Sequence, residues 1–159
     1  MEGIIMDVEK IVREYIDKTI HMSLATSKVN KPWVCEVHFV YDKDLNLYFR
    51  SIAPRRHSQE ISANPSVAGN IVKQHGLGEY PHAIYFEGKA KPITSAQDRE
   101  KIFPLFQERF GVGQSVLDES AQPDGHHFYK ITVENWYCFG KFGGEKGQKT
   151  KLEWNGGNK

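Results

Sequence analysis

Apolar residues recur at helical spacing at the start of the chain and alternate with polar residues further on. The helical part covers residues 4–18, where seven apolar residues share one face: Ile4, Ile5, Val8, Ile11, Val12, Tyr15 and Ile16. This spacing predicts one amphipathic helix. From His21 on, the shorter period is typical of β-strands.

Segments with strand character follow one another in hairpin order: HMSLATS (21–27), PWVCEVHFVY (32–41), LYFRS (47–51), SVAGNIVKQ (66–74) and HAIYFEGKAKPI (82–93). The intervening VNKP, DKDLN and HGLGEYP read as turns or loops. One short helix, SQEISAN, is predicted to begin near His57 or Ser58 and to end at Asn64, before Pro65.

The last third of the chain adds a second long helix and the final strands. Thr94 and Gln97 form a capping-box pattern, which predicts a helix over residues 95–110, and Pro104 should kink it or split it in two. Its apolar stripe is interpreted as core packing: Ile102, Phe103, Phe106 and Phe110. A polar loop and candidate lid (111–125) precedes the last strands: HHFYKITVE (126–134), NWYCFGKF (135–142) and KLEW (151–154), with a hairpin-like GGEKGQ (143–148) between the last two.

Six or seven strands in hairpin succession, with helices at the start, in the middle and between strands, predict a mainly β fold, a small antiparallel β-barrel with α-helices. The predicted organisation is one domain over residues 1–159, with the N-terminal helix at 4–18, the barrel at about 20–154 and a frayed tail at 155–159. Strand–helix alternation and a G-x-G-x-x-G turn are both absent, which excludes a Rossmann fold.

Charge and cysteine content narrow the class of protein. The 21 Lys and Arg residues nearly balance the 20 Asp and Glu residues, whereas nucleic-acid binders carry a broad basic surface. The start, MEGIIMDVEKIV, has acids where a signal peptide would have basic residues, and no stretch approaches the roughly 20 apolar residues of a membrane helix. Cys35 and Cys138 lie far apart, which predicts buried free thiols, without a disulfide or a zinc site. We therefore expect a cytoplasmic protein with no nucleic-acid or membrane partner.

Positive charge is concentrated at a predicted helix start, in FRSIAPRRHSQEIS (49–62). Because the free N–H groups already make this end of a helix positive, each added cation should cost about a few tenths of a kcal/mol. We interpret the surplus as a site for a small anion such as a phosphate, which Arg, Ser and backbone N–H groups bind together. The candidate residues are Arg50, Ser51, Arg55, Arg56, His57 and Ser58. A solvated basic patch is the alternative for the arginines, and a plain N-cap is the alternative for Ser58.

Other residues with possible chemistry give weaker signals. His126 and His127 would point to opposite faces of a strand and cannot chelate one metal together, and His38 with Glu36 makes no site alone. Trp136 is interpreted as a core or interface aromatic, with stacking on a planar ligand left open. No H-E-x-x-H or G-x-S-x-G motif occurs. The sequence therefore predicts no metal site and leaves catalytic residues unknown, so a cofactor should carry any chemistry.

The order of these segments resembles the FMN-binding split-barrel family related to pyridoxamine 5′-phosphate oxidase. The resemblance covers residues 22–72 closely: the LAT strand, a turn with a proline, a strand pair joined by an acidic hairpin, and YF-x-S followed by a basic pair and a helix running into NPSVA. It implies a six-stranded, antiparallel, Greek-key split barrel that forms a homodimer, with two FMN sites at the subunit interface.

The resemblance also implies roles for particular residues. Arg50 and Ser51 would lie beside the ribityl-phosphate arm of FMN, and Arg56 and His57 occupy the basic-pair positions that hold the phosphate. Trp136 would lie near the site of the facing subunit. The isoalloxazine ring would run along the backbone in the middle of the second strand, at Glu36, Val37 and His38.

Two positions depart from the family pattern. His57 stands where the family usually has Lys, so at neutral pH it would supply a hydrogen bond rather than a full charge. The chain ends KFGGEKGQKTKLEWNGGNK and lacks the Arg- and His-bearing C-terminal segment with which pyridoxamine phosphate oxidases hold their substrate. We therefore expect flavin binding without oxidation of vitamin B6.

The predicted function is an FMN-dependent oxidoreductase that acts on an unknown small substrate. The alternative is a non-catalytic flavin- or haem-binding module of a stress-related kind, and some split-barrel relatives bind a deazaflavin. A structural or nucleic-acid-binding barrel is a third hypothesis, against which the net charge of +1 already counts.

Overall fold

The computed structural model describes residues 7–140 and 149–152. Twelve elements follow one another along the chain: α1 (Val8–Asp17), β1 (His21–Lys28), β2 (Lys31–His38), β3 (Val40–Tyr41), β4 (Leu47–Ser51), α2 (Arg56–Ala63), β5 (Ser66–Ile71), β6 (Ala83–Pro92), α3 (Ala96–Phe110), α4 (Gln114–Glu119), β7 (His127–Phe139) and β8 (Lys149–Lys151). The predicted hairpin-like GGEKGQ and the predicted tail at 155–159 lie outside the described residues, as does the beginning of the predicted N-terminal helix.

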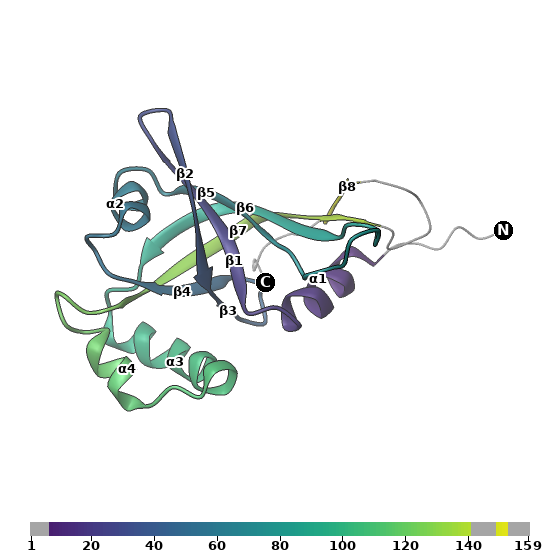
Figure 1. Ribbon diagram of the computed structural model, residues 1–159. Helices are drawn as coiled ribbons and strands as arrows, with labels where there is room; N and C mark the ends of the chain where they lie inside the picture. Colours follow the sequence, from purple (N-terminus) through teal and green to yellow (C-terminus); the bar gives the residue numbers. More distant parts are fainter. Residues whose placement is uncertain (1–6, 141–148, 153–159) are drawn as a thin grey trace.

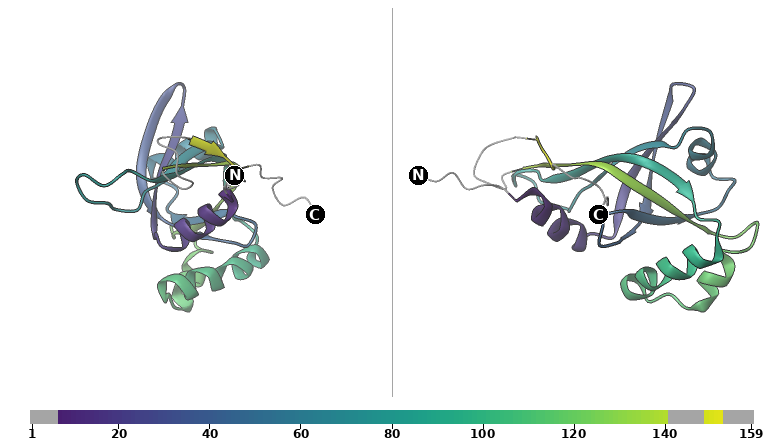
Figure 2. Two further views of the ribbon diagram at one scale, coloured as in Figure 1. Left: turned by 90° about the vertical axis from the view of Figure 1, so that its right-hand side faces the viewer. Right: turned by 180° about the vertical axis from the view of Figure 1, so that it is seen from behind.

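All strands join one antiparallel sheet in the order β2-β1-β5-β6-β7-β4-β3, with β8 paired to β7. The two edges, β2 and β3, are consecutive in the chain, so the sheet curls into an open barrel. Figure 1 shows α1 beneath one end of the sheet and α3 with α4 beneath the other. The β1–β2 hairpin projects beyond the body beside α2, as all three views show (Figures 1 and 2). The mainly β split-barrel fold class is thereby confirmed.

Two groups of buried side chains hold the fold together. The larger group lines the inside of the curled sheet and includes Phe39, Phe49, Phe86 and Trp136. α1 closes this group with one apolar stripe: Val8, Val12, Tyr15 and Ile16. The smaller group is where α3 packs on the outside of the sheet: Ile102, Phe103 and Phe106 against Val40, Tyr48 and Phe128. The apolar stripe of α3 therefore serves the core, as expected.

The strand count differs from the six expected, for two local reasons. The segment PWVCEVHFVY is one strand in the sequence pattern, yet Phe39 leaves the ladder and donates its backbone N–H to the carbonyl of Ile20 (3.1 Å), which separates β2 from β3. β8 (Lys149–Lys151), which overlaps the predicted strand KLEW at Lys151, adds a further short strand beyond the six. The predicted strands 126–134 and 135–142 are instead one long strand, β7, because Asn135 stays in the ladder opposite Glu87.

A β-bulge at Glu87 and Gly88 accommodates this long pairing of β6 and β7. Position 88 needs a glycine, because a Cβ there would lie 2.2 Å from the backbone oxygen of Thr132. Asn135 donates from its side-chain amide to Glu87 Oε1 at 2.8 Å. The bulge thus keeps two strands in register where the sequence pattern suggested a break.

Helix starts also differ from prediction. α2 has Arg55 as its N-cap, so Ser58 lies inside the helix and the N-cap alternative for Ser58 is wrong. α3 is capped by Ser95, whose hydroxyl accepts from the N–H of Asp98, one position after the predicted Thr94. Pro104 lies within one continuous helix, so α3 is not split. Within the predicted polar loop, residues 114–119 form the short helix α4.

Candidate functional site

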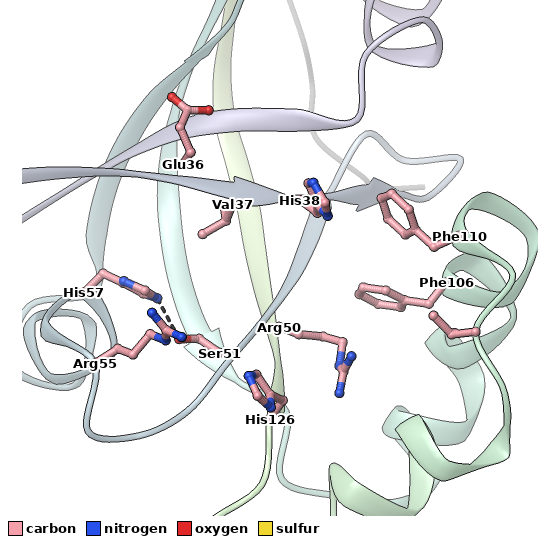
Figure 3. Close-up of a pocket in the computed structure, with 11 residues that line it drawn as sticks. Glu36, Val37, His38, Arg50, Ser51, Arg55, His57, Phe106, Phe110 and His126 are labelled. Carbon is pink, nitrogen blue, oxygen red and sulfur yellow. Dashed lines mark hydrogen bonds between the residues drawn. The ribbon is translucent and has the colours of Figure 1, made fainter.

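A cleft of about 470 Å³ opens between β2, the end of β4, the start of α2 and the end of α3 (Figure 3). It lies where the tight turn that joins β4 to α2 faces β2, the edge strand of the sheet. Its lining residues are Glu36, Val37, His38, Arg50, Ser51, Arg55, His57, Phe106, Phe110, Val112 and His126. Cations and hydroxyl groups gather at one end, and aromatic side chains of α3 close the other (Figure 3).

Ser51, Arg55 and His57 form the polar end, which we call the anion corner. Arg55 is exposed and makes no ion pair with a described residue. As the N-cap of α2, it offers no side-chain acceptor to the first turn, and that turn contains no acidic residue. The free N–H groups of the helix start, a guanidinium and a hydroxyl thus meet at one corner, which is the donor set that a phosphate or carboxylate requires.

The His57 ring is the centre of a buried hydrogen-bond chain. Its Nε2 lies 2.7 Å from Ser51 Oγ, and its Nδ1 lies 3.3 Å from Cys35 Sγ. Ser58 donates its hydroxyl to Ser51 Oγ at 3.0 Å. Burial and then the Arg55 cation lower the pKa of His57, against an opposite influence of Glu60. The imidazole is therefore neutral at pH 7 and fixed on both sides.

Cys35 is half-buried on β2 rather than fully buried, whereas Cys138 is buried as predicted. Burial, followed by the nearby Glu36 carboxylate, raises the pKa of the Cys35 thiol. Its role beside His57 is therefore that of a neutral thiol, not a thiolate nucleophile.

Arg56 lies outside the lining of the cleft. Its Nε donates to Glu60 Oε1 at 2.8 Å, one turn along α2, and its guanidinium lies 4.3 Å from the centre of the Trp33 ring. Glu60 also accepts the Thr26 hydroxyl at 2.5 Å, and these two hydrogen bonds, from Thr26 and then from Arg56, lower the pKa of Glu60. The charge of Arg56 is therefore balanced within the protein.

The middle of β2 forms one wall of the cleft. Val37 points into the cleft, while the Glu36 side chain points away from it (Figure 3) and accepts a hydrogen bond from Ser23. His38 stacks on Phe110, with ring centres 5.4 Å apart and ring planes inclined by 17°. β2 thus offers its backbone and one apolar side chain to a ligand, and His38 reaches the aromatic end.

The floor of the cleft holds an ion-pair cluster that the sequence did not reveal. Glu119 at the end of α4 accepts from Arg50 Nη2 at 2.7 Å and pairs with His126 Nδ1 at 2.7 Å. The His126 hydrogen bond, with further help from the Arg50 charge, lowers the pKa of Glu119. The Arg50 Nε is buried and has no hydrogen-bond partner among the described residues. Arg50 therefore keeps one donor for another group.

Seven of the ten predicted cofactor residues line the cleft, and three do not: Arg56, Ser58 and Trp136. Trp136 is fully buried in the core and packs against Phe86 with ring centres 5.7 Å apart. The sequence reading missed the lining residues Phe106, Phe110, Val112 and His126. The two phenylalanines belong to a stripe that packs the core with one side and meets the cleft at its end, and periodicity cannot separate these uses.

Within residues 7–140 and 149–152 the structure contains no group of three or more His, Cys, Asp or Glu side chains that could hold a metal ion. In the same part of the chain, no helix is both long enough and apolar enough to cross a membrane.

The chain matches one protein family in sequence and several solved structures in fold. A sequence model described as Pyridoxamine 5′-phosphate oxidase matches residues 8–139. No curated protein sequence matches the chain significantly.

Several solved structures share the fold at low sequence identity. Campylobacter jejuni ChuZ has a TM-score of 0.75 at 17% identity, covering 96% of this chain and 61% of that one. A haem-binding protein from Mycobacterium smegmatis has a TM-score of 0.70 at 13% identity, covering 88% and 55%. An FAD-binding protein from Mesorhizobium loti has a TM-score of 0.63 at 18% identity, covering 80% and 89%.

Proposed function

Because this chain belongs to the pyridoxamine 5′-phosphate oxidase family, we propose that it binds FMN in the cleft and acts as a flavin-dependent oxidoreductase on a small substrate. The observation that carries the proposal is the make-up of the cleft, which has anion donors at one end and aromatic side chains at the other. Its volume of about 470 Å³ falls in the range of roughly 300–1,000 Å³ that is usual for ligand pockets.

The anion corner fits the phosphate of FMN. Arg55 supplies a guanidinium without an internal partner, Ser51 a hydroxyl, and the start of α2 its free backbone N–H groups. Arg50 lines the floor between the two ends, and its buried Nε has no hydrogen-bond partner among the described residues. These groups would bind and orient a phosphate as hydrogen-bond donors, and none of them would act as a general acid or base.

The other end of the cleft fits a planar ring. Val37, Phe106 and Phe110 are apolar, and His38 stacks on Phe110. The flavin would supply hydride transfer, which none of these side chains can perform. The protein's part is to hold the ring against β2, to exclude water with the aromatic side chains of α3 and to leave room for a substrate.

We further propose a homodimer with the cofactor sites at the subunit interface. No residue of β2 is buried, although the strand carries apolar side chains. Trp33 and Val34 are 41% and 59% exposed. β2 is also an edge strand of the sheet, and proteins normally protect an exposed edge strand from pairing with other chains. A second copy that covers β2 would bury these side chains and close the cleft, for which β2 is one wall.

A cytoplasmic location completes the proposal, since Cys35 and Cys138 are both free thiols and reducing compartments keep thiols in this state.

A non-catalytic haem- or flavin-binding module is the second candidate. His38 and His126 place imidazoles in the cleft, and imidazole is a common axial ligand of haem iron. The fold similarity to a haem-binding protein is consistent with this candidate.

A visible absorption spectrum of the purified protein separates the two candidates. Absorption maxima in the near ultraviolet and the blue, with FMN identified by mass spectrometry of the released ligand, are expected; a Soret band supports haem, and a colourless protein that binds neither contradicts both. Reduction of bound flavin by a reduced nicotinamide, followed by repeated turnover, distinguishes the enzyme from a binding module.

A further inference from the structure

Neutral His57 stands in the anion corner with both ring nitrogens already hydrogen-bonded. A neutral imidazole carries one N–H, so one of its two partners, Ser51 or Cys35, must donate to it. The half-buried Cys35 thiol, whose pKa is raised, keeps its proton and can donate to Nδ1. Ser58 donates to Ser51, so within the protein the hydroxyl hydrogen of Ser51 can point to Nε2 or make a weak contact with the Ile52 carbonyl (3.5 Å).

A second proton on the His57 ring would change the direction of these hydrogen bonds without moving any heavy atom. Both ring nitrogens would then donate, Nε2–H to Ser51 Oγ and Nδ1–H to Cys35 Sγ. Ser51 would accept from His57 and Ser58, and its own hydrogen would turn into the cleft that it lines. Protonation of the ring therefore adds a charge to the anion corner and leaves the Ser51 hydroxyl able to donate only into the cleft.

The charges around the anion corner favour protonation of His57 when a phosphate binds. Above about pH 6 a phosphate monoester carries nearly two negative charges. Arg50 and Arg56 are already paired with Glu119 and Glu60. Arg55 is therefore the one permanent cation of the anion corner without an internal acid among the described residues.

We propose that binding of the phosphate dianion in the anion corner is coupled to the uptake of one proton by the His57 imidazole. This inference rests on the proposed function. Without a bound anion, burial and Arg55 lower the pKa of His57 and keep the ring neutral; the dianion offsets Arg55 and favours the imidazolium. A Lys at this position would be charged in both states and would take up no proton.

The neighbouring titratable groups do not offer the same response. On α2, Arg55 and Arg56 are permanently charged, and Glu60 is held ionised by Thr26 and Arg56. On β2, the Cys35 thiol is already protonated, and Glu36 points to the other face of the strand. The remaining imidazoles that line the cleft, those of His38 and His126, and the floor residue Arg50 lie toward the aromatic end and the floor, where the flavin ring would affect them.

Isothermal titration in two buffers of different ionisation enthalpy measures the proton uptake directly. At pH 7.5 free FMN is already a dianion, because its second phosphate pKa is about 6. We expect the wild-type protein to take up about half to one proton per FMN. Riboflavin, which has the ring but no phosphate, should cause almost no uptake and serves as the control for His38 and His126.

His57→Gln, which keeps hydrogen-bonding groups but cannot be charged, and His57→Lys should both bind FMN with almost no proton uptake. Between the pKa of His57 in the free protein and its higher pKa in the FMN complex, the wild-type Kd for FMN should rise with pH by up to about tenfold per unit, while that of His57→Lys stays flat. Uptake that is equal for riboflavin and FMN, or that persists in His57→Gln, overturns the inference. Tight FMN binding to the wild type without uptake also overturns it, yet leaves the cofactor assignment intact. Failure of the protein to bind either flavin overturns both.

Discussion

The adjacent residues Arg55 and Arg56 offer a decisive test of the site. The family resemblance gives the phosphate to Arg56, whereas the structure places Arg55 in the cleft and pairs Arg56 with Glu60. The two residues are consecutive and both are arginines, so each Ala variant removes the same charge and serves as the control for the other. We expect Arg55→Ala to weaken FMN binding much more than Arg56→Ala does.

The size of the effect follows from the kind of contact. A hydrogen bond to a charged group is worth about 1.5–3 kcal/mol. Arg55 is exposed, and solvent weakens its pull on the phosphate, so the lower figure applies. At about 1.4 kcal/mol per factor of ten, Arg55→Ala should raise the Kd for FMN about tenfold. Arg56→Ala removes a more distant, already neutralised charge and should change it by less than about fivefold.

Titration of both variants with FMN and with riboflavin gives the required comparison. Arg55→Ala should leave the riboflavin Kd almost unchanged, because riboflavin places no phosphate beside the guanidinium. Equal losses for the two ligands would remove Arg55 from the phosphate role. A larger FMN-specific loss in Arg56→Ala would return that role to Arg56 and would show that its pairing with Glu60 gives way when the ligand binds.

Four further changes test other parts of the molecule. Glu119→Gln should lower the melting temperature at pH 7 by a degree or two, since exposed ion pairs contribute less than about 1 kcal/mol. The pKa of the Glu119 carboxyl is lowered in the folded protein, so its stabilisation is fully present above the ordinary value of about 4.5. The difference in melting temperature from the wild type should therefore vanish as the pH falls through the lowered pKa. Phe110→Ala should weaken FMN and riboflavin equally, by about tenfold, and a phosphate-dependent loss would contradict its place at the ring end. Val34→Glu should raise the dimer dissociation constant at least about tenfold in analytical ultracentrifugation, whereas an unchanged dimer would show that β2 is not in the interface. Gly88→Ala should destabilise the fold by about 1–3 kcal/mol in urea denaturation, because a Cβ there would meet the backbone of β7, and unchanged stability would contradict this close approach.

Much of the fold was visible in the sequence because each strand carries its own local signal. Alternation and turn residues identified β1, β4 and β6 to within one residue at each end, whereas β5 ends at Ile71, three residues before the end of the predicted strand 66–74. What failed were features set by partners far away in the chain. The break at Phe39 depends on the carbonyl of Ile20, and the continuity of β7 through Asn135 depends on the bulge in β6.

The candidate site divides in the same way. The anion corner comes from one continuous stretch, so its donors could be recognised together, and even the Arg56–Glu60 pair has the helical spacing of four residues. Glu119 lies 69 residues from Arg50, in a segment whose polar composition predicted a loop. Only the packing of α3 and α4 against the sheet brings this carboxylate to the lining residues Arg50 and His126.

This geometry changes the reason for expecting an anion at the start of α2. Counted along the sequence, the cations are an unbalanced surplus that a negative ligand would have to neutralise. In the folded protein Arg50 and Arg56 have acidic partners and His57 is neutral, so the surplus shrinks to Arg55. A single exposed guanidinium would bind an anion weakly and with little selectivity. What favours a phosphate here is the convergence of different donors on one corner: the guanidinium, the Ser51 hydroxyl and a helix start without a capping side chain. Selectivity for phosphate over other anions should therefore depend more on the direction of these donors than on the amount of positive charge.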